Sequence, residues 1–286
     1  MAERRIGART FDFDTQVAVM AVVNRTPDSF YDKGATFALD RAIAAALQAA
    51  DDGADWVDIG GVPFGRGPVV TVEEEIARVV PVVEGVAAAS DVVISVDTTS
   101  AEVARQAIAA GAAVINDTSG LWDEGMVGVI ADSSATLVLT HSVGPPRSAP
   151  PRPHYEDVVA EVAAFLRERV DRALAAGIPP ERLVIDPGHD LNKNTLHTLE
   201  LTRRLDEIVA IGYPTLAAVS NKDFVGESID REQGQRLEGS LAAAVVCIMK
   251  GARIVRMHDV RASLAAVRMT EAILGFRQPA YLRHNI

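Results

Sequence analysis

The chain has 286 residues, of which 48% are apolar and 23% charged, a composition typical of a globular protein with a sizeable core. Its net charge of −11 argues against nucleic acid or an anionic membrane as a partner, and no apolar run reaches the roughly 18 residues of a membrane span. The single cysteine, Cys247, excludes an internal disulfide and indicates a reducing compartment, so we expect a cytoplasmic protein.

The predicted elements repeat one unit along the chain: a short Val- and Ile-rich run, a loop, and an Ala-rich amphipathic helix. After an N-terminal extension at 1–16, strands are predicted at 17–24, 56–61, 92–98, 113–118, 136–141, 183–188, 214–221 and 253–259. Helices are predicted between them, most clearly at 39–54, 72–86, 101–111, 157–177 and 237–251. Helix-capping signals mark several ends, namely Thr71 with Glu74 at a start and Gly53, Gly111, Gly177 and Gly251 after helices.

This alternation predicts an α/β fold. Most strands read as continuous apolar runs, which is typical of parallel strands buried on both faces. Eight alternations without a break in composition favour a single (β/α)₈ TIM barrel domain over residues 1–286. The alternative, an open doubly wound sheet, is not supported, because no G-x-G-x-x-G motif follows the first strand.

A polar or ionisable group stands at or just beyond the end of each predicted strand. In a barrel these groups meet at the C-terminal face, where barrel enzymes place their sites. Carboxylates after apolar runs are costly to bury without a partner, so their convergence with basic groups favours a polar ligand. The residues are Asn24, Asp58, Asp97, Asn116, His141, Asp186, Ser220, Lys222, Arg256 and His258.

The expected ligand has two kinds of surface. Carboxylates and amides suit a flat heterocycle with N–H and amino donors, whereas Arg256, His258, Asn24 and Arg25 suit an anionic end such as phosphate. Asn24 is the one obvious hard-oxygen metal ligand near the basic groups, which favours Mg²⁺ held mainly by substrate phosphates. No HxH pair ends the first strand and no G-x-S-x-G elbow is present, which argues against a binuclear metallohydrolase and a Ser-His-Asp hydrolase.

The order of several motifs resembles the dihydropteroate synthase family over nearly the whole chain. The combination of an N-x-T-P-D-S-F motif with D-P-G and R-x-H-D-V in one barrel is specific to that family. The motifs are VVNRTPDSF (22–30), VDIGG (57–61), SVDT (95–98), INDTSG (115–120), IDPGHDLNKN (185–194), SNKDFVG (220–226) and RMHDV (256–260).

The resemblance implies a transferase that joins 6-hydroxymethyl-dihydropterin pyrophosphate to p-aminobenzoate and releases pyrophosphate, on the route to folate. Asp97, Asn116, Asp186 and Lys222 match family positions that hold the pterin ring, and Asp58 is included among the substrate-binding residues. Asn24, Arg256 and His258 match positions that hold pyrophosphate and Mg²⁺, with Asn24 as the metal ligand, and Asp97, Asp186, Lys222 and Arg256 form the predicted catalytic set. A homodimer is also implied.

Four loops depart from the family pattern. The usual G-G-E-S-T-R-P-G after the second strand is GGVPFGRG (60–67), and the usual S-R-K after the seventh strand is SNK, with Asn221 in place of Arg. D-P-G-F-G-F-G-K has become DPGHDLNK (186–193), and M-H-M-Q-G has become THSVG (140–144). In addition, Arg25 replaces a small apolar residue, and the Pro-rich segment 143–155 is predicted to form a loop over the barrel mouth.

These departures fall mainly on the aminobenzoate side and leave three hypotheses. The favoured one is a divergent paralogue that binds a pterin pyrophosphate or another phosphate-bearing molecule, with weak, altered or absent condensation. The second is a fully active synthase with unusual loops. The third is a non-catalytic binding protein on the same scaffold, which the survival of Asp97, Asn116, Asp186 and Lys222 argues against.

Overall fold

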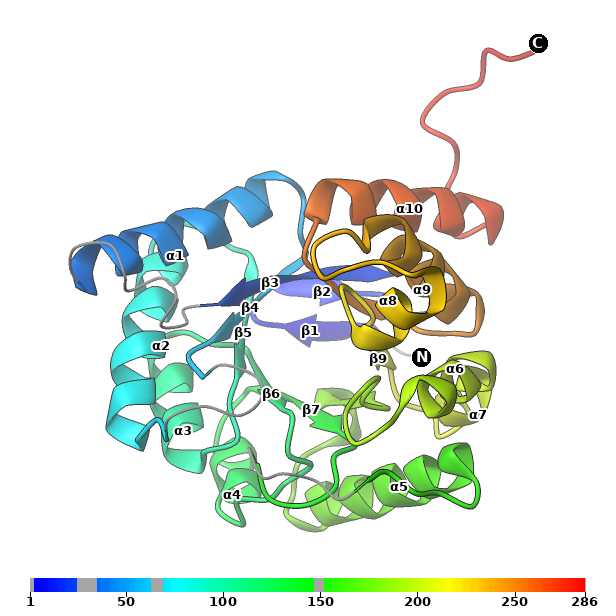
Figure 1. The fold of residues 1–286 in the computed structure, drawn as a ribbon. Helices are drawn as coiled ribbons and strands as arrows, with labels where there is room; N and C mark the ends of the chain where they lie inside the picture. Colours follow the sequence, from blue (N-terminus) through cyan, green and yellow to red (C-terminus); the bar gives the residue numbers. More distant parts are fainter. Residues whose placement is uncertain (1–2, 25–34, 63–68, 147–151, 286) are drawn as a thin grey trace.

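The computed structural model describes residues 3–24, 35–62, 69–146 and 152–285, with the backbone alone for residue 24 and residues 35–37. In these ranges eight parallel strands form one sheet in the order β8-β7-β6-β5-β4-β3-β10-β9. A bridge between Ile185 and Thr215 joins the two edge strands and closes the sheet into a barrel. The predicted TIM barrel is therefore confirmed, with the helices lying outside the strands (Figure 1).

All eight predicted strands are present, although most end earlier than predicted because the final residues turn into the loops. They are β3 (Ala18–Asn24), β4 (Trp56–Gly60), β5 (Val93–Asp97), β6 (Val114–Asp117), β7 (Thr136–Thr140), β8 (Leu183–Asp186), β9 (Leu216–Ala217) and β10 (Ile254–Met257). A short 3₁₀ turn, η2 (Pro180–Arg182), precedes β8.

The five clearly predicted helices correspond to α1 (Ala35–Asp51), α2 (Val72–Ala87), α3 (Ala101–Ala110), α5 (Val158–Ala175) and α9 (Leu237–Met249). The remaining helices are α4 (Met126–Ala131), α6 (Thr195–Arg203), α7 (Leu205–Val209), α8 (Asp223–Ile229) and α10 (Val260–Ile273). The capping box at Thr71 and Glu74 is present, because each side chain accepts a hydrogen bond from the other residue's backbone N–H. Each predicted C-cap glycine has a positive φ.

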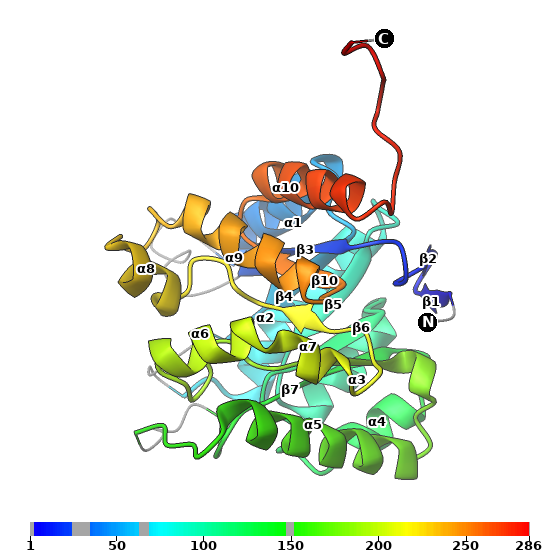
Figure 2. The ribbon, with the colours of Figure 1, turned by 90° about the vertical axis from the view of Figure 1, so that its right-hand side faces the viewer.

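An N-terminal hairpin closes the bottom of the barrel. Within the extension at 1–16, β1 (Arg4–Ile6) pairs antiparallel with β2 (Arg9–Phe11). Ile6, Phe11 and Phe13 are buried against inward-facing strand residues such as Trp56, and the Phe11 and Phe13 rings stack. Figure 2 shows the hairpin at one end of the barrel and α8 at the other, with the C-terminal residues extending away from the body.

A second and larger apolar layer lies between the strands and the surrounding helices. Outward-facing strand residues such as Val57, Ile115 and Leu137 pack there against helix residues such as Val82 and Leu166. In the ranges that the structure describes, no helix combines the length and apolarity needed to cross a bilayer.

Candidate active site

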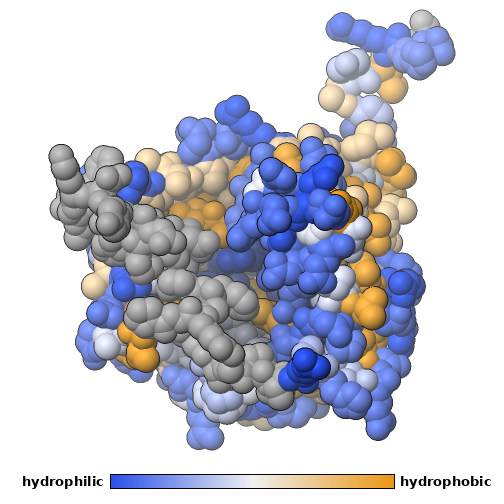
Figure 3. All heavy atoms as spheres, in the orientation of Figure 1, coloured by the Kyte–Doolittle hydropathy of each residue, from blue (hydrophilic) through white to orange (hydrophobic). Residues whose placement is uncertain are grey.

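The pocket is formed where the inward-facing residues of the barrel change from apolar to polar. Side chains alternate along a strand, so every second residue points into the barrel. Near the hairpin these residues are apolar, as with Met20 and Val138, whereas nearer the strand ends they include Asn116, Thr140 and Asp186. The resulting pocket at the mouth has a volume of about 690 Å³, a size suited to a small molecule. Figure 3 looks onto this face, where hydrophilic residues gather over α8.

Asp58 organises the floor from below. Its carboxylate is fully buried and accepts hydrogen bonds from Ser95 Oγ at 2.6 Å, Asn116 Nδ2 at 3.1 Å and Arg256 Nε at 2.7 Å. Because Asn116 Nδ2 donates to Asp58, the side-chain oxygen of Asn116 is left without a hydrogen-bond partner among the described residues. Asp58 therefore orients Asn116 and Arg256, and it does not itself line the pocket.

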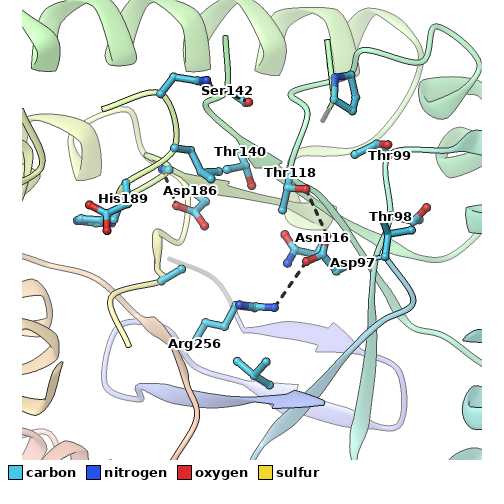
Figure 4. A pocket seen from close by; sticks show the side chains of 18 of the residues that line it. Asp97, Thr98, Thr99, Asn116, Thr118, Thr140, Ser142, Asp186, His189 and Arg256 are labelled. Carbon is cyan, nitrogen blue, oxygen red and sulfur yellow. Dashed lines mark hydrogen bonds and ion pairs between the residues drawn. The ribbon is translucent and has the colours of Figure 1, made fainter. Parts of the chain in front are cut away.

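Asp97 lies above this floor, at the end of β5. Its carboxylate is 3.6 Å from Arg256 Nη2 and accepts a hydrogen bond from Thr118 Oγ1 at 3.2 Å (Figure 4). Loss of hydration and the nearby charge of Asp58 raise the pKa of Asp97 to about 7, against the lowering effect of Arg256. A carboxyl group that titrates near neutral pH can accept ligand N–H donors when ionised and donate a proton when it is not.

Asp186 and Lys222 lie on the opposite side of the pocket. Asp186 ends β8 and accepts a hydrogen bond from Gly188 N at 2.7 Å, while burial raises its pKa to about 6. Lys222 stands at the N-terminal end of α8, and burial followed by the charge of Arg256 lowers its pKa. Gly188 is required here, because a Cβ at this residue would lie 2.2 Å from the His141 carbonyl oxygen.

The cationic side of the pocket is formed by β10. Burial alone would lower the pKa of Arg256, but Asp58 and Asp97 outweigh it and raise that pKa, so the guanidinium stays charged. His258 lies at the exposed rim, where Nδ1 is 2.9 Å from Ser220 Oγ. Burial, Arg256 and Lys222 lower the pKa of His258, which favours a neutral ring at neutral pH.

The loop after β8 is tied to both neighbouring loops by residues that replace family glycines. Asp190 and Asn192 have left-handed backbones, with φ of 64° and 53°. Asp190 accepts hydrogen bonds from Thr198 Oγ1 at 3.1 Å and Phe224 N at 3.2 Å. The side-chain oxygen of Asn192 accepts from Val143 N at 2.5 Å and from Ser142 Oγ at 3.1 Å.

Lys193 fixes the same loop from within. Its buried ammonium donates to the carbonyl oxygens of Gly188 and Leu191 at 2.9 and 3.0 Å and lies 2.9 Å from His141 Nδ1. Burial lowers the pKa of Lys193 to about 7, and burial together with Lys193 lowers the pKa of His141 to about 2. His141 therefore serves this network, not the pocket that it was expected to line.

Asn221, which replaces the family arginine, also has a structural partner. It has a φ of 59°, and its side-chain oxygen accepts a hydrogen bond from Gly234 N at 3.0 Å. The backbone carbonyl of Asn221 accepts a hydrogen bond from Arg236 Nη1 at 3.2 Å. This residue therefore organises its own loop and brings no positive charge to the pocket wall that it lines.

Most of the predicted site residues converge on one pocket, namely Asp97, Asn116, Asp186, Lys222, Arg256 and His258. Asp58 lies beneath the pocket, which differs from its predicted role in binding substrate directly. The backbone of Asn24 ends β3, but its side chain lies outside the described residues, as do Arg25 and residues 63–68 of the departing loop. The described ends of the segment 143–155 border the pocket through Val143, Pro145 and Pro146.

Other pocket residues were not predicted. Thr118, Thr140 and Ser142 line the wall, together with His189 from the loop after β8. The first three could have been predicted from the alternation of inward- and outward-facing side chains along a strand. Thr118 follows Asn116 by two positions, and Thr140 and Ser142 lie on either side of His141 in sequence. The sequence places His189 in a substituted loop but does not give the direction of its side chain.

Comparisons with known proteins agree with this geometry. The family described as pterin binding enzyme matches residues 20–258. The chain is 46% identical over 267 residues to inactive dihydropteroate synthase 2 of Mycobacterium leprae (strain TN), covering 91% of this chain and 92% of that protein. It is 39% identical over 261 residues to dihydropteroate synthase of Escherichia coli (strain K12), covering 91% and 93% of the two chains.

A solved structure also matches the fold. Dihydropteroate synthase from Xanthomonas albilineans, in complex with 7,8-dihydropteroate, has a TM-score of 0.86 and 40% identity, covering 96% of this chain and 99% of that one. The matches extend over most of the chain, including the strand ends that form the pocket. The chain belongs to the family of pterin binding enzymes, and its similarity to dihydropteroate synthases extends over most of its length.

Proposed function

We propose that this protein binds a pterin that carries a phosphate or pyrophosphate group and condenses it with p-aminobenzoate slowly or not at all. Asn116 and the carboxylates of Asp97 and Asp186 would receive the N–H and amino donors of the ring. Arg256, with His258 at the rim, would hold the phosphate oxygens, and Lys222 would donate to an acceptor atom of the ring. Support comes from their presence in one pocket, where Asp58 already orients Asn116 and Arg256.

The same arrangement suits bond cleavage at the pterin methylene. If the C–O bond breaks before an amine attacks, positive charge develops on the methylene and negative charge on the departing pyrophosphate. Asp97 and Asp186 would stabilise the first charge and Arg256 the second, because their orientation is fixed before the reaction. Such a reaction needs no protein nucleophile.

A magnesium ion, when bound, would neutralise charge on the phosphate oxygens. Among the described residues no group of three or more His, Cys, Asp or Glu side chains is placed to hold a metal. We therefore assign most of its ligands to the substrate phosphates, with Asn24 as the protein ligand, since amide and phosphate oxygens suit Mg²⁺.

The proposal of weak condensation rests mainly on one observation: the acceptor side of the pocket lacks the family's cation. Asn221 stands at that position, and its side-chain oxygen is occupied by Gly234 N. The loop at 62–65 likewise has no hydroxyl or charged side chain to orient an aminobenzoate. The similarity to a synthase named as inactive supports the same conclusion.

Restoring the acceptor side tests this proposal. We would make Asn221→Arg together with Val62→Glu, Pro63→Ser, Phe64→Thr and Gly65→Arg, and measure dihydropteroate formation. The expected result is a rise in turnover of at least about tenfold, since each recovered polar contact contributes roughly 1.4 kcal/mol. Wild-type turnover as fast as that of an active dihydropteroate synthase would contradict the proposal and favour a fully active synthase, and a variant no faster than a slow wild type would contradict the role given to these loop residues.

We further propose a cytoplasmic homodimer that associates through α9 and α10. These adjacent helices expose large apolar side chains, including Val246 and Met249 on α9 and Met269 and Ile273 on α10. The single buried Cys247 is consistent with a reducing compartment. Sedimentation analysis should show a dimer that Val246→Asp with Met269→Glu converts to monomer, and a wild-type monomer at micromolar concentration would contradict the assignment.

A further inference from the structure

Two buried polar side chains in the pocket wall lack hydrogen-bond partners. Thr140 Oγ1 and both ring nitrogens of His189 make no hydrogen bond within the described part of the chain, although both residues line the pocket. Thr140 is 1% exposed and His189 is fully buried. A buried polar group without a partner destabilises a protein relative to an apolar group of the same shape, so these residues require an explanation.

The two side chains flank Asp186. Thr140 pairs in register with Asp186 on the neighbouring strand, and His189 follows Asp186 by three residues in the same loop. The His189 ring stacks on Phe224 of α8, with ring centroids 6.3 Å apart and planes at 29°, which restricts its orientation. Figure 4 shows Thr140, Asp186 and His189 along one side of the pocket, opposite Asp97.

The surroundings of His189 favour an oxygen as partner. Burial, Lys193 and Lys222 lower the pKa of His189 to about 3, so the ring is neutral and offers one N–H donor and one acceptor. The N–H of this ring can donate to a ligand oxygen, a partner that no described residue supplies. The Thr140 hydroxyl is a second neutral donor next to the Asp186 carboxylate, which already serves ligand N–H groups in the proposed function.

We propose that Thr140 and His189 are specificity-determining residues that select a pterin-like heterocycle with an additional oxygen, as an oxo or hydroxyl substituent, on the edge facing β7 and β8. This inference rests on the proposed pterin binding and narrows its ligand class. The corresponding family patterns have methionine and an aromatic residue at these two positions, neither of which offers such a donor.

Calorimetric titration with matched heterocycles tests the proposal. The probes are pterin, its 6-oxo and 7-oxo analogues, and 6-hydroxymethyl-dihydropterin pyrophosphate as the reference for pterin binding, titrated into the full chain and into Thr140→Val, His189→Phe and a control, Thr270→Val. Thr270 is equally buried but lies on α10, and its hydroxyl donates to the carbonyl oxygen of Ala266 at 2.8 Å. Thr140→Val keeps the side-chain shape and removes the hydroxyl, whereas His189→Phe replaces the imidazole with a somewhat larger ring that has no hydrogen-bonding atoms.

We expect the wild type to bind at least one oxo analogue about tenfold more tightly than pterin, the effect of one good hydrogen bond. Each pocket variant should reduce this ratio to near one, and the control should keep it. The thermal midpoint of ligand-free Thr140→Val should not fall, whereas a merely structural role of the hydroxyl would lower it.

Wild-type protein that binds pterin and every oxo analogue equally would overturn the inference and leave the proposed function standing. A preference that survives both pocket variants would also overturn it. Failure of every probe to bind, 6-hydroxymethyl-dihydropterin pyrophosphate included, would instead overturn the proposed pterin binding itself, so the two failures are distinguishable.

Discussion

At the level of single residues, the Asp58 carboxylate determines how charge is arranged beneath the pocket. It accepts hydrogen bonds from Ser95, Asn116 and Arg256, three donors on three other strands. Arg256 is held by this carboxylate at 2.7 Å and is 3.6 Å from Asp97. The buried pair thus positions the guanidinium that we assign to phosphate binding.

Asp58→Asn should destabilise the fold and weaken ligand binding together. Removing the negative charge leaves Arg256 buried with only the more distant Asp97, and breaking a buried ion pair typically costs about 3 kcal/mol or more. Urea unfolding of the ligand-free protein measures this loss. Glu102→Gln, which removes the exposed pair with Arg105, is the control and should have a much smaller effect. Equal losses in the two variants would contradict the role of Asp58.

The raised pKa of Asp97 predicts a pH dependence of stability. The pKa is 3.8 for the unfolded group and about 7 in the fold, so the folded state binds more protons. The contribution of Asp97 to stability is therefore fully present below about pH 4 and is lost as the pH rises through 7. Three other buried groups have lowered pKa values, so their contributions make stability rise with pH; they are His141, His189 and Lys193. The contribution of Asp97 is therefore measured as the difference between the wild type and a variant that lacks its carboxyl group.

The Asp97→Asn variant isolates the contribution of Asp97 to the pH dependence of stability. Compared with the variant, the wild type should lose thermal stability between pH 4.5 and pH 7.5, and the difference curve should level off above about pH 8. Thermal unfolding of both proteins across this range gives the curve directly. A difference that is independent of pH would mean that Asp97 keeps an ordinary pKa.

At the level of elements, the loop after β8 shows how substituted glycine positions keep their backbone conformation. Asp190 and Asn192 adopt positive φ angles, which Asn and Asp tolerate better than most residues. Their side chains then bond to α8 and to the loop after β7, contacts that glycine cannot make. The substitutions therefore connect the three loops that border the acceptor side of the pocket.

Asp190→Gly and Asn192→Gly should loosen this loop without straining its backbone. Each removes side-chain hydrogen bonds worth about 1 kcal/mol apiece, while glycine accepts the positive φ freely. Hydrogen exchange should therefore become faster in residues 187–194 and 141–146 and stay unchanged in α3. Unaltered exchange in both loops would show that other contacts, such as those of Lys193, are sufficient to hold them.

The elements also show where sequence reasoning succeeds. Apolar runs and helix caps predicted the eight barrel strands and the ends of α2, because both depend on local patterns. The alternation of side chains along a strand would have identified Thr118, Thr140 and Ser142 as pocket residues. Choosing the last residue of each apolar run instead selected His141, which contacts Lys193 and does not line the pocket. Asp58, Asp190 and Asn221 have partners that lie between 8 and 198 residues away in sequence, and no local pattern reveals such contacts.

At the level of the whole molecule, the barrel has a closed bottom and a polar mouth. The N-terminal hairpin supplies Ile6, Phe11 and Phe13 to the lower interior, where they contact the inward-facing apolar residues of the strands. Phe11 meets Phe13 face to face at 5.6 Å and Trp56 edge on at 5.9 Å. The residues beneath the Asp58 network are therefore shielded from water at the opposite end of the barrel.

Phe11→Ala should destabilise the barrel by about 3–5 kcal/mol, because the ring is buried and its removal leaves a cavity that the strands cannot fill. Denaturant unfolding measures the loss. Tyr281→Ala provides the control, since that ring is 74% exposed near the C-terminus and should be close to neutral. A change below about 1 kcal/mol for Phe11→Ala would mean that the hairpin does not support the core.

Binding and turnover measured in the same samples would show whether the pterin site is retained while condensation is impaired. Calorimetric titration with 6-hydroxymethyl-dihydropterin pyrophosphate and Mg²⁺ would be followed by p-aminobenzoate and an assay for dihydropteroate, with the Escherichia coli synthase in parallel. We expect micromolar or tighter binding of the pterin and turnover at least about a hundredfold below that of the reference enzyme. Turnover within about tenfold of that enzyme would instead identify an active synthase with unusual loops.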